Sequence, residues 1–271
     1  MHLPEPLASA PWPPGLPIPV AAVPAEGGFV ARGWLGELAD GTPVAVKVTP
    51  YPADAEADGL AALASAGVPA PEVLGHVAGT LVMRRVSGPA DWPSLGRAVA
   101  GMHAVTHDRF GWHRDNRMGR FVQPNGWSTS WPEFFVANRV RVHLSDPRVP
   151  AELALRLQRA CDGPLREALD PAPRPSLTHG DLWRGNIIEG RWVVDPEVSF
   201  ADRELDLGNL LTSRDPLPEA FWGAYREFLP LPEGYQRRIR PLGLHHALLG
   251  VRHFGDRAVP RLAALLTELG W

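Results

Sequence analysis

The feature that most constrains the fold of this 271-residue chain is the segment THGDLWRGNIIEGRWVVDPE at positions 178–197. It contains two short apolar runs separated by Glu-Gly-Arg, a pattern that predicts a tight β-hairpin. Such a hairpin returns Asp195, at its end, to the loop that carries Asp181 and Asn186. The segment therefore predicts that two carboxylates and one carboxamide oxygen converge at an open strand end.

Oxygen ligands of this kind suit Mg²⁺, which takes its remaining ligands from water and substrate phosphates. Asp181 precedes Asn186 by five residues, as in a kinase catalytic loop, where the aspartate is the catalytic base. In such a loop the asparagine and a later aspartate, here Asp195, hold the metal. An isolated aspartate near a turn more often has only a structural role in that turn. The combined spacing of these three residues and His179 favours a catalytic and metal-binding role instead.

A second candidate group lies in the first third of the chain. Lys47 is the only lysine among 27 basic residues. Biased codon usage explains the excess of arginine, yet a position that keeps lysine is a candidate for chemistry that a guanidinium cannot perform. Alternation places Lys47 on the strand face opposite its valines, and Glu56 shares the apolar stripe of the next helix with Leu60. A buried carboxylate needs a partner, so we predict a Lys47–Glu56 pair at the nucleotide phosphates; the alternative is a solvated Glu56.

The order of secondary-structure signals predicts an α+β protein with two lobes. Strand patterns over residues 28–48 and 80–83 flank a helical pattern at 53–66. The remainder of the chain is predominantly helical in pattern. We predict a small antiparallel β-sheet lobe for nucleotide binding over residues 1–86, and a mainly helical catalytic and substrate-binding lobe over residues 87–271.

Two features of the first lobe are weaker candidates for nucleotide contacts. Gly27, Gly28 and Gly33 precede the strand of Lys47 and are candidates for a loop that covers phosphates, although they do not complete a G-x-G-x-x-G pattern. Met83, at the end of a strand, begins a linker whose backbone is a candidate for adenine contacts by analogy with kinases.

The composition excludes several classes of protein. The formal net charge is −3 and there is no basic stripe, so we expect no nucleic-acid partner and no membrane partner. Cys161 is the only cysteine, which excludes an intrachain disulfide and a cysteine-based zinc site. The proline-rich N-terminus, expected to be irregular or partly extended, does not resemble a signal peptide. We therefore expect a soluble cytoplasmic protein of undetermined oligomeric state.

The motif THGDLWRGN at 178–186 resembles the fructosamine kinases, also called ketosamine-3-kinases, within the wider aminoglycoside-phosphotransferase-like group. The pattern HGD followed by Asn and Asp is common to the whole group. The segment FGWHRDNRMGRFVQPNGWSTSWPEFFVANRVRVHL at 110–144 is the discriminating one, because it is similar to a long run of the fructosamine kinases. Trp183 also matches that family better than its relatives, and the resemblance covers nearly the whole chain after about residue 27.

The resemblance implies a protein-kinase-like fold and a kinase that uses ATP and Mg²⁺ to phosphorylate O3 of a ketosamine, a ketose attached to an amine. The phosphorylated adduct sheds its sugar, which restores the amine. The resemblance also implies roles for individual residues: Asp181 as base, Asn186 and Asp195 as metal ligands, Lys47 and Glu56 as the nucleotide pair, Arg84, Arg85 and Val86 as the adenine-contacting linker, Trp183 as a substrate contact, and Asp206 as a brace of the catalytic loop. The chain departs from the family at Glu197, where a small residue is usual.

Several alternatives stay open at this point. The acceptor is alternatively another small alcohol, of the aminoglycoside, homoserine or choline type, or the chain is a non-catalytic pseudokinase-like binding module. Trp112, Trp127 and Trp131 either contact a sugar ring or fill the core. We expect His179 to be a structural hydrogen-bonder rather than the base, and the other histidines, which lack ligand spacing, not to form a metal set. The sequence selects neither the sugar nor a free or protein-bound amine.

Overall fold

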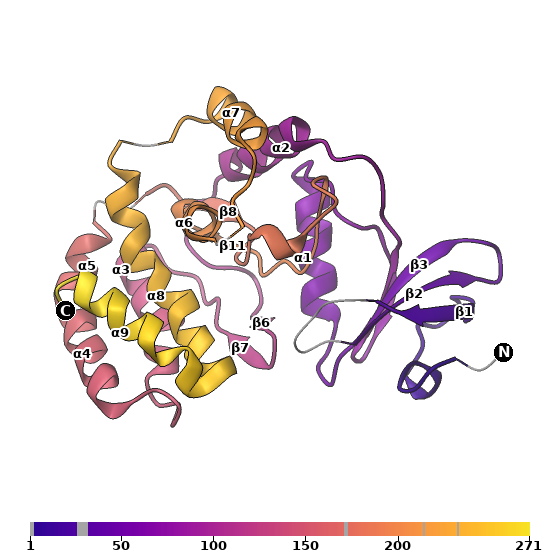
Figure 1. Ribbon diagram of the computed structural model, residues 1–271, viewed down its shortest axis with the longest axis horizontal. Coiled ribbons are helices and arrows are strands. Elements are labelled where there is room, and N and C mark those ends of the chain that lie inside the picture. The colour runs from indigo at the N-terminus through magenta and orange to yellow at the C-terminus, as the bar shows by residue number, and fades with distance from the viewer. Residues whose placement is uncertain (1–2, 26–31, 171–172, 214, 232) are drawn as a thin grey trace.

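The structure is a computed structural model that describes residues 3–25, 32–170, 173–213, 215–231 and 233–271. A β-sheet forms the end of the molecule near the N-terminus, and helices form the opposite end, where the chain finishes (Figure 1). This arrangement confirms the predicted α+β class, with a small antiparallel sheet and a mainly helical remainder.

Within the described residues, the sheet and the helix that packs on it are β1 (Pro19–Pro24), β2 (Arg32–Leu38), β3 (Pro43–Val48), β4 (Val73–Val77), β5 (Thr80–Arg84) and α1 (Asp54–Ser65). The later helices are α2 (Trp92–Ala104), α3 (Trp131–Phe135), α4 (Ala151–Asp162), α5 (Pro164–Ala168), α6 (Glu204–Thr212), α7 (Glu219–Phe228), α8 (Tyr235–Phe254) and α9 (Val259–Glu268). Short strand pairs lie between them: β6 (Asn116–Met118) with β7 (Phe121–Gln123), β8 (Ser176–Thr178) with β11 (Ser199–Ala201), and β9 (Ile187–Ile188) with β10 (Trp192–Val193). Single helical turns are Leu7–Ser9, Val136–Val140, Arg141–His143, Arg184–Asn186 and Gly255–Arg257.

The sheet has the strand order β1-β2-β3-β5-β4, and each neighbouring pair is antiparallel. β1 begins and ends with proline. The sheet tolerates these prolines because β1 is an edge strand, which needs no N–H donors on its open side. The proline-rich N-terminus therefore supplies a strand that its composition did not predict in detail.

Side-chain alternation on β3 separates the two faces of the sheet, as predicted. Val44 and Val46 are buried with Leu7 of the N-terminal segment, which covers the outer face. Ala45 points to the other face, where Leu60 of α1 is buried. Because Lys47 lies on the same face as Ala45, the fold directs its side chain toward α1.

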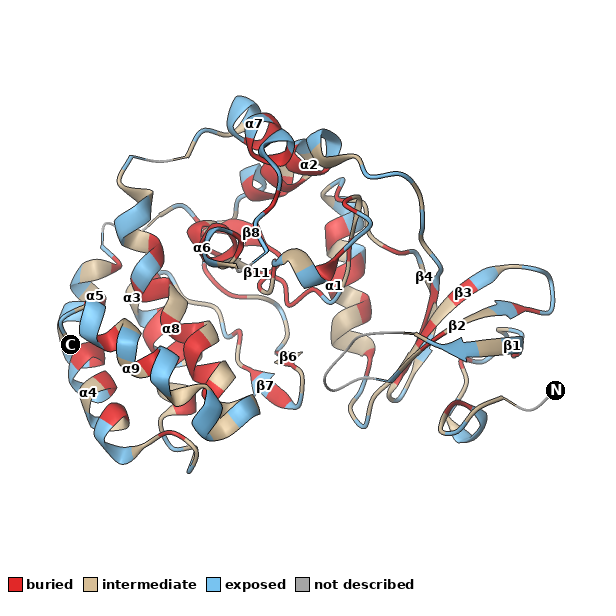
Figure 2. Cartoon of the chain, in the orientation of Figure 1, coloured by how far each residue is buried: buried red, intermediate tan, exposed pale blue. Residues whose placement is uncertain are grey.

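The helical part of the molecule is organised around two buried clusters. One gathers α3, α4, α5, α8 and α9, and the other joins α2, α6 and α7 to the loop that follows β8. Figure 2 shows buried residues concentrated on α6 and on the inward side of α8. Trp131 is fully buried in the first cluster, so of the two alternatives it fills the core. Within the described ranges, no helix is both long and apolar enough to cross a membrane.

Candidate active site

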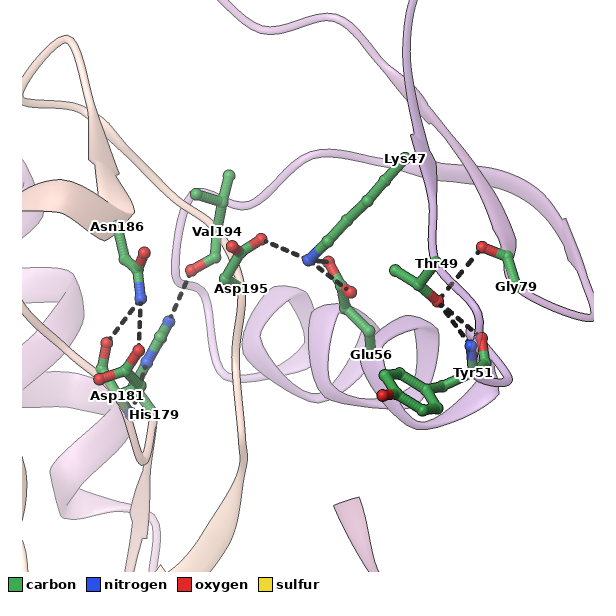
Figure 3. Close-up of polar contacts among 10 residues, drawn as sticks. All are labelled: Lys47, Thr49, Tyr51, Glu56, Gly79, His179, Asp181, Asn186, Val194 and Asp195. Atoms are coloured by element: carbon green, nitrogen blue, oxygen red, sulfur yellow. Dashed lines mark hydrogen bonds and ion pairs between the residues drawn. The ribbon is translucent and has the colours of Figure 1, made fainter. Parts of the chain in front are cut away.

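The hairpin that the sequence predicts is present at residues 187–193. β9 pairs antiparallel with β10, and the backbone N–H of Val194 donates to the carbonyl oxygen of Asn186 at 3.0 Å. Glu189 in the turn has a φ of +50°, the left-handed conformation that a tight turn requires. Asn186 therefore lies just before β9 and Asp195 just after β10, on neighbouring stretches of backbone (Figure 3).

Asp181 lies in the loop before this hairpin, and side chains from other parts of the chain surround its carboxylate. Asn186 Nδ2 donates to Asp181 Oδ2 at 3.0 Å and to the Asp181 backbone oxygen at 2.8 Å. Asn209 Nδ2, on α6, donates to Oδ1 at 3.4 Å, and His246 Nε2, on α8, lies 3.6 Å from the same oxygen. The Asp181 side chain nevertheless stays 25% exposed, so the carboxylate is both oriented and accessible.

The sequence did not predict Asn209 or His246 at this position. Asn209 follows Asp206 by three residues on α6, and helical spacing places both on one side of the helix. That spacing is a signal that could have found Asn209. His246 was grouped with the scattered histidines, and its place beside Asp181 depends on how α8 packs.

Asp206 fixes the backbone of the loop that carries Asp181. Its buried carboxylate accepts hydrogen bonds from the backbone N–H of His179 at 2.7 Å and of Gly180 at 3.0 Å. His103 Nε2 lies 3.1 Å from the same carboxylate. Burial opposes ionisation, but His103 and the neighbouring donors outweigh it and hold the pKa of Asp206 below its ordinary value. The structure thus places an ionised Asp206 against the catalytic loop, the position in which the resemblance implies that it braces that loop.

The ring of His179 connects this loop to the hairpin. Its Nδ1 accepts a hydrogen bond from the backbone N–H of Asp181 at 3.2 Å. The proton therefore belongs on Nε2, which donates to the carbonyl oxygen of Val194 at 3.0 Å. Both ring nitrogens are engaged, which fits the expected structural hydrogen-bonder and leaves Asp181 as the candidate base.

Lys47 contacts two carboxylates from different parts of the chain (Figure 3). Its Nζ lies 2.9 and 2.8 Å from the two oxygens of Glu56 and 3.0 Å from Oδ1 of Asp195. Glu56 is 19% exposed, so it is paired rather than solvated. Gly33 lies opposite Lys47 on β2, whereas Gly27 and Gly28 lie outside the described residues.

Burial and charge act against each other in this group. Burial disfavours the ammonium, but the carboxylates of Glu56 and Asp195 outweigh it and raise the pKa of Lys47. Burial raises the pKa of Glu56, and the Lys47 ammonium only partly opposes that effect. Desolvation opposes ionisation of Asp195 only in part, since its side chain is 47% exposed, and the Lys47 ammonium outweighs it and lowers the pKa of the carboxyl. Lys47 is therefore a charged lysine with Asp195 as an ionised partner.

The segment expected to contact adenine, residues 83–86, runs out of the sheet from β5. Its first residue is buried with the sheet, whereas Arg84 and Arg85 are exposed. Their backbone N–H groups donate to the carbonyl oxygens of Glu72 at 2.8 Å and Pro43 at 3.0 Å, respectively. These two N–H groups are therefore engaged within the lobe. Val86 and the backbone carbonyl oxygens of the segment are better placed to contact adenine.

Trp183 follows Asp181 by two residues and is 38% exposed. Its indole lies across Gly185, where a Cβ would come within 2.2 Å of the ring, so this close approach requires glycine. The backbone oxygen of Trp183 accepts a hydrogen bond from the N–H of Asn186 at 3.0 Å. The turn that carries the candidate base and metal ligand thus also presents an accessible aromatic ring.

Two buried charged residues behind the loop were not predicted as part of the site. Gly180, with a φ of +87°, packs so closely on Glu197 that a Cβ would lie 2.2 Å from the Glu197 backbone oxygen. Burial raises the pKa of the Glu197 carboxyl well above its ordinary value, and the charge of Asp181 adds to this. Arg139 donates to Asn125 Oδ1 at 2.6 Å, and burial lowers its pKa to about 9. Tertiary packing buries both side chains behind the loop, and no local sequence pattern predicts that location.

The oxygen ligands at the hairpin fit a divalent cation that the protein binds through only one or two side chains. Among the described residues, no group of three or more His, Cys, Asp or Glu side chains has an arrangement that could hold a metal ion. The hairpin instead offers one carboxylate, of Asp195, and one carboxamide, of Asn186, whose Nδ2 faces Asp181. Mg²⁺ commonly binds through one or two protein oxygens with water and phosphate oxygens as its other ligands.

The chain matches the family model of the fructosamine kinases over residues 27–269. It belongs to the fructosamine kinase family. Because that match covers both the sheet and the helical part, the resemblance read from residues 110–144 and from the HGDLWRGN motif is confirmed. Membership of a kinase family makes the protein a phosphotransferase.

Individual relatives and solved structures agree with this assignment. A probable ketoamine kinase of Synechocystis is 34% identical over 178 residues, which are 60% of this chain and 57% of the relative. A probable ketoamine kinase of Thermus thermophilus is 33% identical over 253 residues, 89% of this chain and 91% of the relative. The crystal structure of a candidate fructosamine-3-kinase from Thermobifida fusca is 29% identical, with 93% of each chain covered and a TM-score of 0.82. The predicted two-lobed protein-kinase-like fold is confirmed.

Proposed function

We propose that this protein uses ATP to phosphorylate O3 of a ketosamine, an adduct of an amine with a sugar of the fructose or ribulose type. The observation that carries the proposal is the accessible carboxylate of Asp181, which the amide groups of Asn186 and Asn209 orient. The exposed indole of Trp183 follows it by two residues. Family membership supports the kinase chemistry. The phosphorylated adduct then sheds its sugar, so the reaction frees the amine.

Asp181 acts as the catalytic base. The amide groups of Asn186 and Asn209 fix its carboxylate, and Asp206 fixes the backbone beneath it, so the base needs little rearrangement during the reaction. As the O3 oxygen attacks the γ-phosphorus, its proton passes to Asp181, and the bond between the γ-phosphorus and the leaving ADP oxygen breaks.

Lys47 binds the α- and β-phosphates of the nucleotide. Glu56 holds the ammonium from the side of α1, and the hydrogen bonds to both Glu56 oxygens fix its direction. Asn186 and Asp195 hold Mg²⁺, which neutralises phosphate charge when it is bound. The segment from Met83 to Val86 contacts adenine through Val86 and through backbone carbonyl oxygens, since the N–H groups of Arg84 and Arg85 are already engaged.

Trp183 contacts the acceptor. An indole face can cover the apolar side of a sugar ring and attract the protonated amine of the adduct, a cation–π contact of about 0.5–2 kcal/mol. A sugar that lacks the amine forgoes this contact. We therefore propose a preference for ketosamines over free hexoses.

A phosphorylation screen tests the function. Fructosyl and ribulosyl derivatives of one amine are offered beside glucose, fructose, an aminoglycoside, homoserine and choline, with ADP release and the phosphorylated product both measured. Turnover should be highest with the ketosamines. Preference for any other acceptor rejects the ketosamine assignment, and nucleotide binding without turnover of any acceptor, as in a binding module, rejects the catalytic one.

A further inference from the structure

The helix that carries Glu56 is tied to the helical lobe by side chains outside the site described above. Asp54 and Asp58 lie one turn apart on α1, and both contact the segment 112–114. Trp112 Nε1 donates to Asp58 Oδ2 at 2.7 Å, and His113 Nε2 lies 3.1 Å from Asp58 Oδ1. Two carboxylates on one face of α1 are thus occupied by partners from a segment more than fifty residues later in the chain.

Arg114 adds an ion pair and a backbone contact to this connection. Its guanidinium pairs with the Asp54 carboxylate, and Nη1 also donates to the Asp54 backbone oxygen at 3.2 Å. Three residues on, the guanidinium of Arg117 lies 4.2 Å from the centre of the Tyr51 ring, just before α1. In Figure 1, α1 lies beside β6, and the two elements are in contact. We call Asp54, Asp58, Trp112, His113 and Arg114 the α1 latch.

The segment that supplies the latch is itself fixed to the strand that follows Asp195. The backbone N–H of Gly111 donates to the carbonyl oxygen of Phe200 at 2.9 Å. Asn116 Nδ2, which is buried, donates to the carbonyl oxygen of Val198 at 3.0 Å. The latch is therefore anchored on both of its sides to residues 198–200, only a few positions after the proposed metal ligand.

On its other side, α1 touches the active site directly. Glu56 reaches Lys47, and Gly59 lies so close to Pro196 that a Cβ would be 3.0 Å from the proline ring. Helical geometry separates Glu56 by about 200° from both Asp54 and Asp58. The latch thus holds α1 from one side while Glu56 reaches the Lys47–Asp195 contact from the other.

We propose that Trp112 and Arg114 are positioning residues that hold α1 at the place where Glu56 can pair with Lys47. A charge-assisted hydrogen bond at 2.7 Å and a guanidinium–carboxylate pair are among the stronger polar contacts available to a protein. Their loss lets α1 move away from Pro196, so that Glu56 leaves the ammonium. The discriminating segment at 110–144 then acts on nucleotide binding through α1.

The lone lysine makes this inference testable without an activity assay. An amine reagent applied under conditions that spare the N-terminus labels Lys47 alone. The Lys47 side chain is only 19% exposed and both oxygens of Glu56 lie against its ammonium, so departure of Glu56 uncovers the amine and speeds its labelling.

The test compares Trp112→Phe, Arg114→Gln and the double variant with two matched controls. Trp12→Phe removes an indole hydrogen bond, to the Leu16 oxygen at 2.9 Å, on the far side of the sheet. Arg226→Gln removes the exposed ion pair to Glu219 on α7. We expect the double variant to label faster than both controls and to show a several-fold higher KM for ATP, with the acceptor KM within about twofold of wild type. Arg114→Lys keeps the charge but adds a second reactive amine, so it is assayed by the KM for ATP alone, which should return part of the way to the wild-type value.

Each outcome decides the proposal. Labelling rates equal to those of the controls in the folded single variants overturn the latch, and so does an effect confined to the acceptor KM. If the double variant fails to fold, Trp112→Phe alone is used, because it keeps an aromatic ring against Phe200. This proposal rests on the proposed function only in giving Lys47 its role at the nucleotide. Failure of ATP·Mg²⁺ to slow Lys47 labelling in the wild type would reject that role. The difference in labelling rate between the variants and the controls tests the latch by itself.

Discussion

Asp206 Oδ2 accepts a 2.7 Å hydrogen bond from the backbone N–H of His179, two residues before Asp181. A buried side chain on α6 thereby fixes the backbone of the loop that carries the proposed base. Asp206→Ala leaves the N–H groups of His179 and Gly180 without this acceptor, and each buried unsatisfied donor costs about 1–3 kcal/mol. We expect the free energy of unfolding in urea to fall by about 2 kcal/mol or more, and kcat to fall with it. An unchanged unfolding curve would show that the loop holds its shape without Asp206.

Asp181→Asn should abolish turnover while nucleotide binding stays close to normal. The amide cannot accept the proton of the acceptor hydroxyl, whereas Lys47 and Asp195 are untouched. Loss of a general base typically lowers the rate by about 10²–10⁴-fold. The two readouts are kcat and the dissociation constant of ATP·Mg²⁺. A variant that keeps near-normal kcat removes Asp181 from the mechanism.

Lys47→Arg keeps the positive charge but should lose most activity. The ammonium lies within 3.0 Å of both Glu56 and Asp195, and a planar guanidinium cannot occupy the same point between them. Because no other lysine exists in the chain, amine labelling should inactivate the wild-type enzyme, and ATP·Mg²⁺ should protect it. Complete labelling without loss of activity would contradict a role for Lys47.

Trp183→Ala should raise the KM for a ketosamine far more than the KM for ATP. The indole is exposed beside Asp181, so its removal takes away acceptor contacts and leaves Lys47 in place. A lost cation–π contact of about 1 kcal/mol corresponds to a change of about fivefold. Trp183→Phe, which keeps an aromatic face over Gly185, is the matched control. Equal increases in both KM values would indicate general disturbance of the loop.

Stability should fall below neutral pH because His143 is held in its neutral form. Its Nδ1 accepts a hydrogen bond from Arg252 at 2.9 Å, and burial together with the Arg252 and Arg139 charges lowers the pKa of His143 to about 3. The unfolded chain binds this proton near pH 6.5, so the contribution is fully present above that pH and is lost progressively toward pH 3.

One such histidine lowers the free energy of unfolding by at most about 1.4 kcal/mol for each pH unit in this range. Urea denaturation at several pH values between 7 and 5 measures the slope. His143→Asn, whose amide oxygen can still accept from Arg252, should have the shallower slope. Identical slopes in the two proteins would show that His143 does not contribute.

The sequence predicted those parts of the site that depend on short-range geometry. A tight turn forces Asn186 and Asp195 together whatever surrounds them, and the confirmed hairpin follows from two apolar runs with Glu189 and Gly190 between them. Strand alternation and helical spacing likewise predicted that Lys47 and Glu56 face each other, which they do at 2.8 Å. The family signature added the fold, which the structural comparison confirms.

The tertiary structure alone decided which distant residues meet in the site and around it. His246 reaches Asp181 because α8 packs behind the loop, Glu197 is buried because Gly180 lies against its backbone, and Trp112 reaches Asp58 because residues 110–118 run beside α1. Each of these contacts joins elements whose separation along the chain carries no periodic signal. Local spacing constrains neighbours a few residues apart through fixed bond geometry, whereas contacts across the molecule depend on how whole helices and strands exclude water from a shared core.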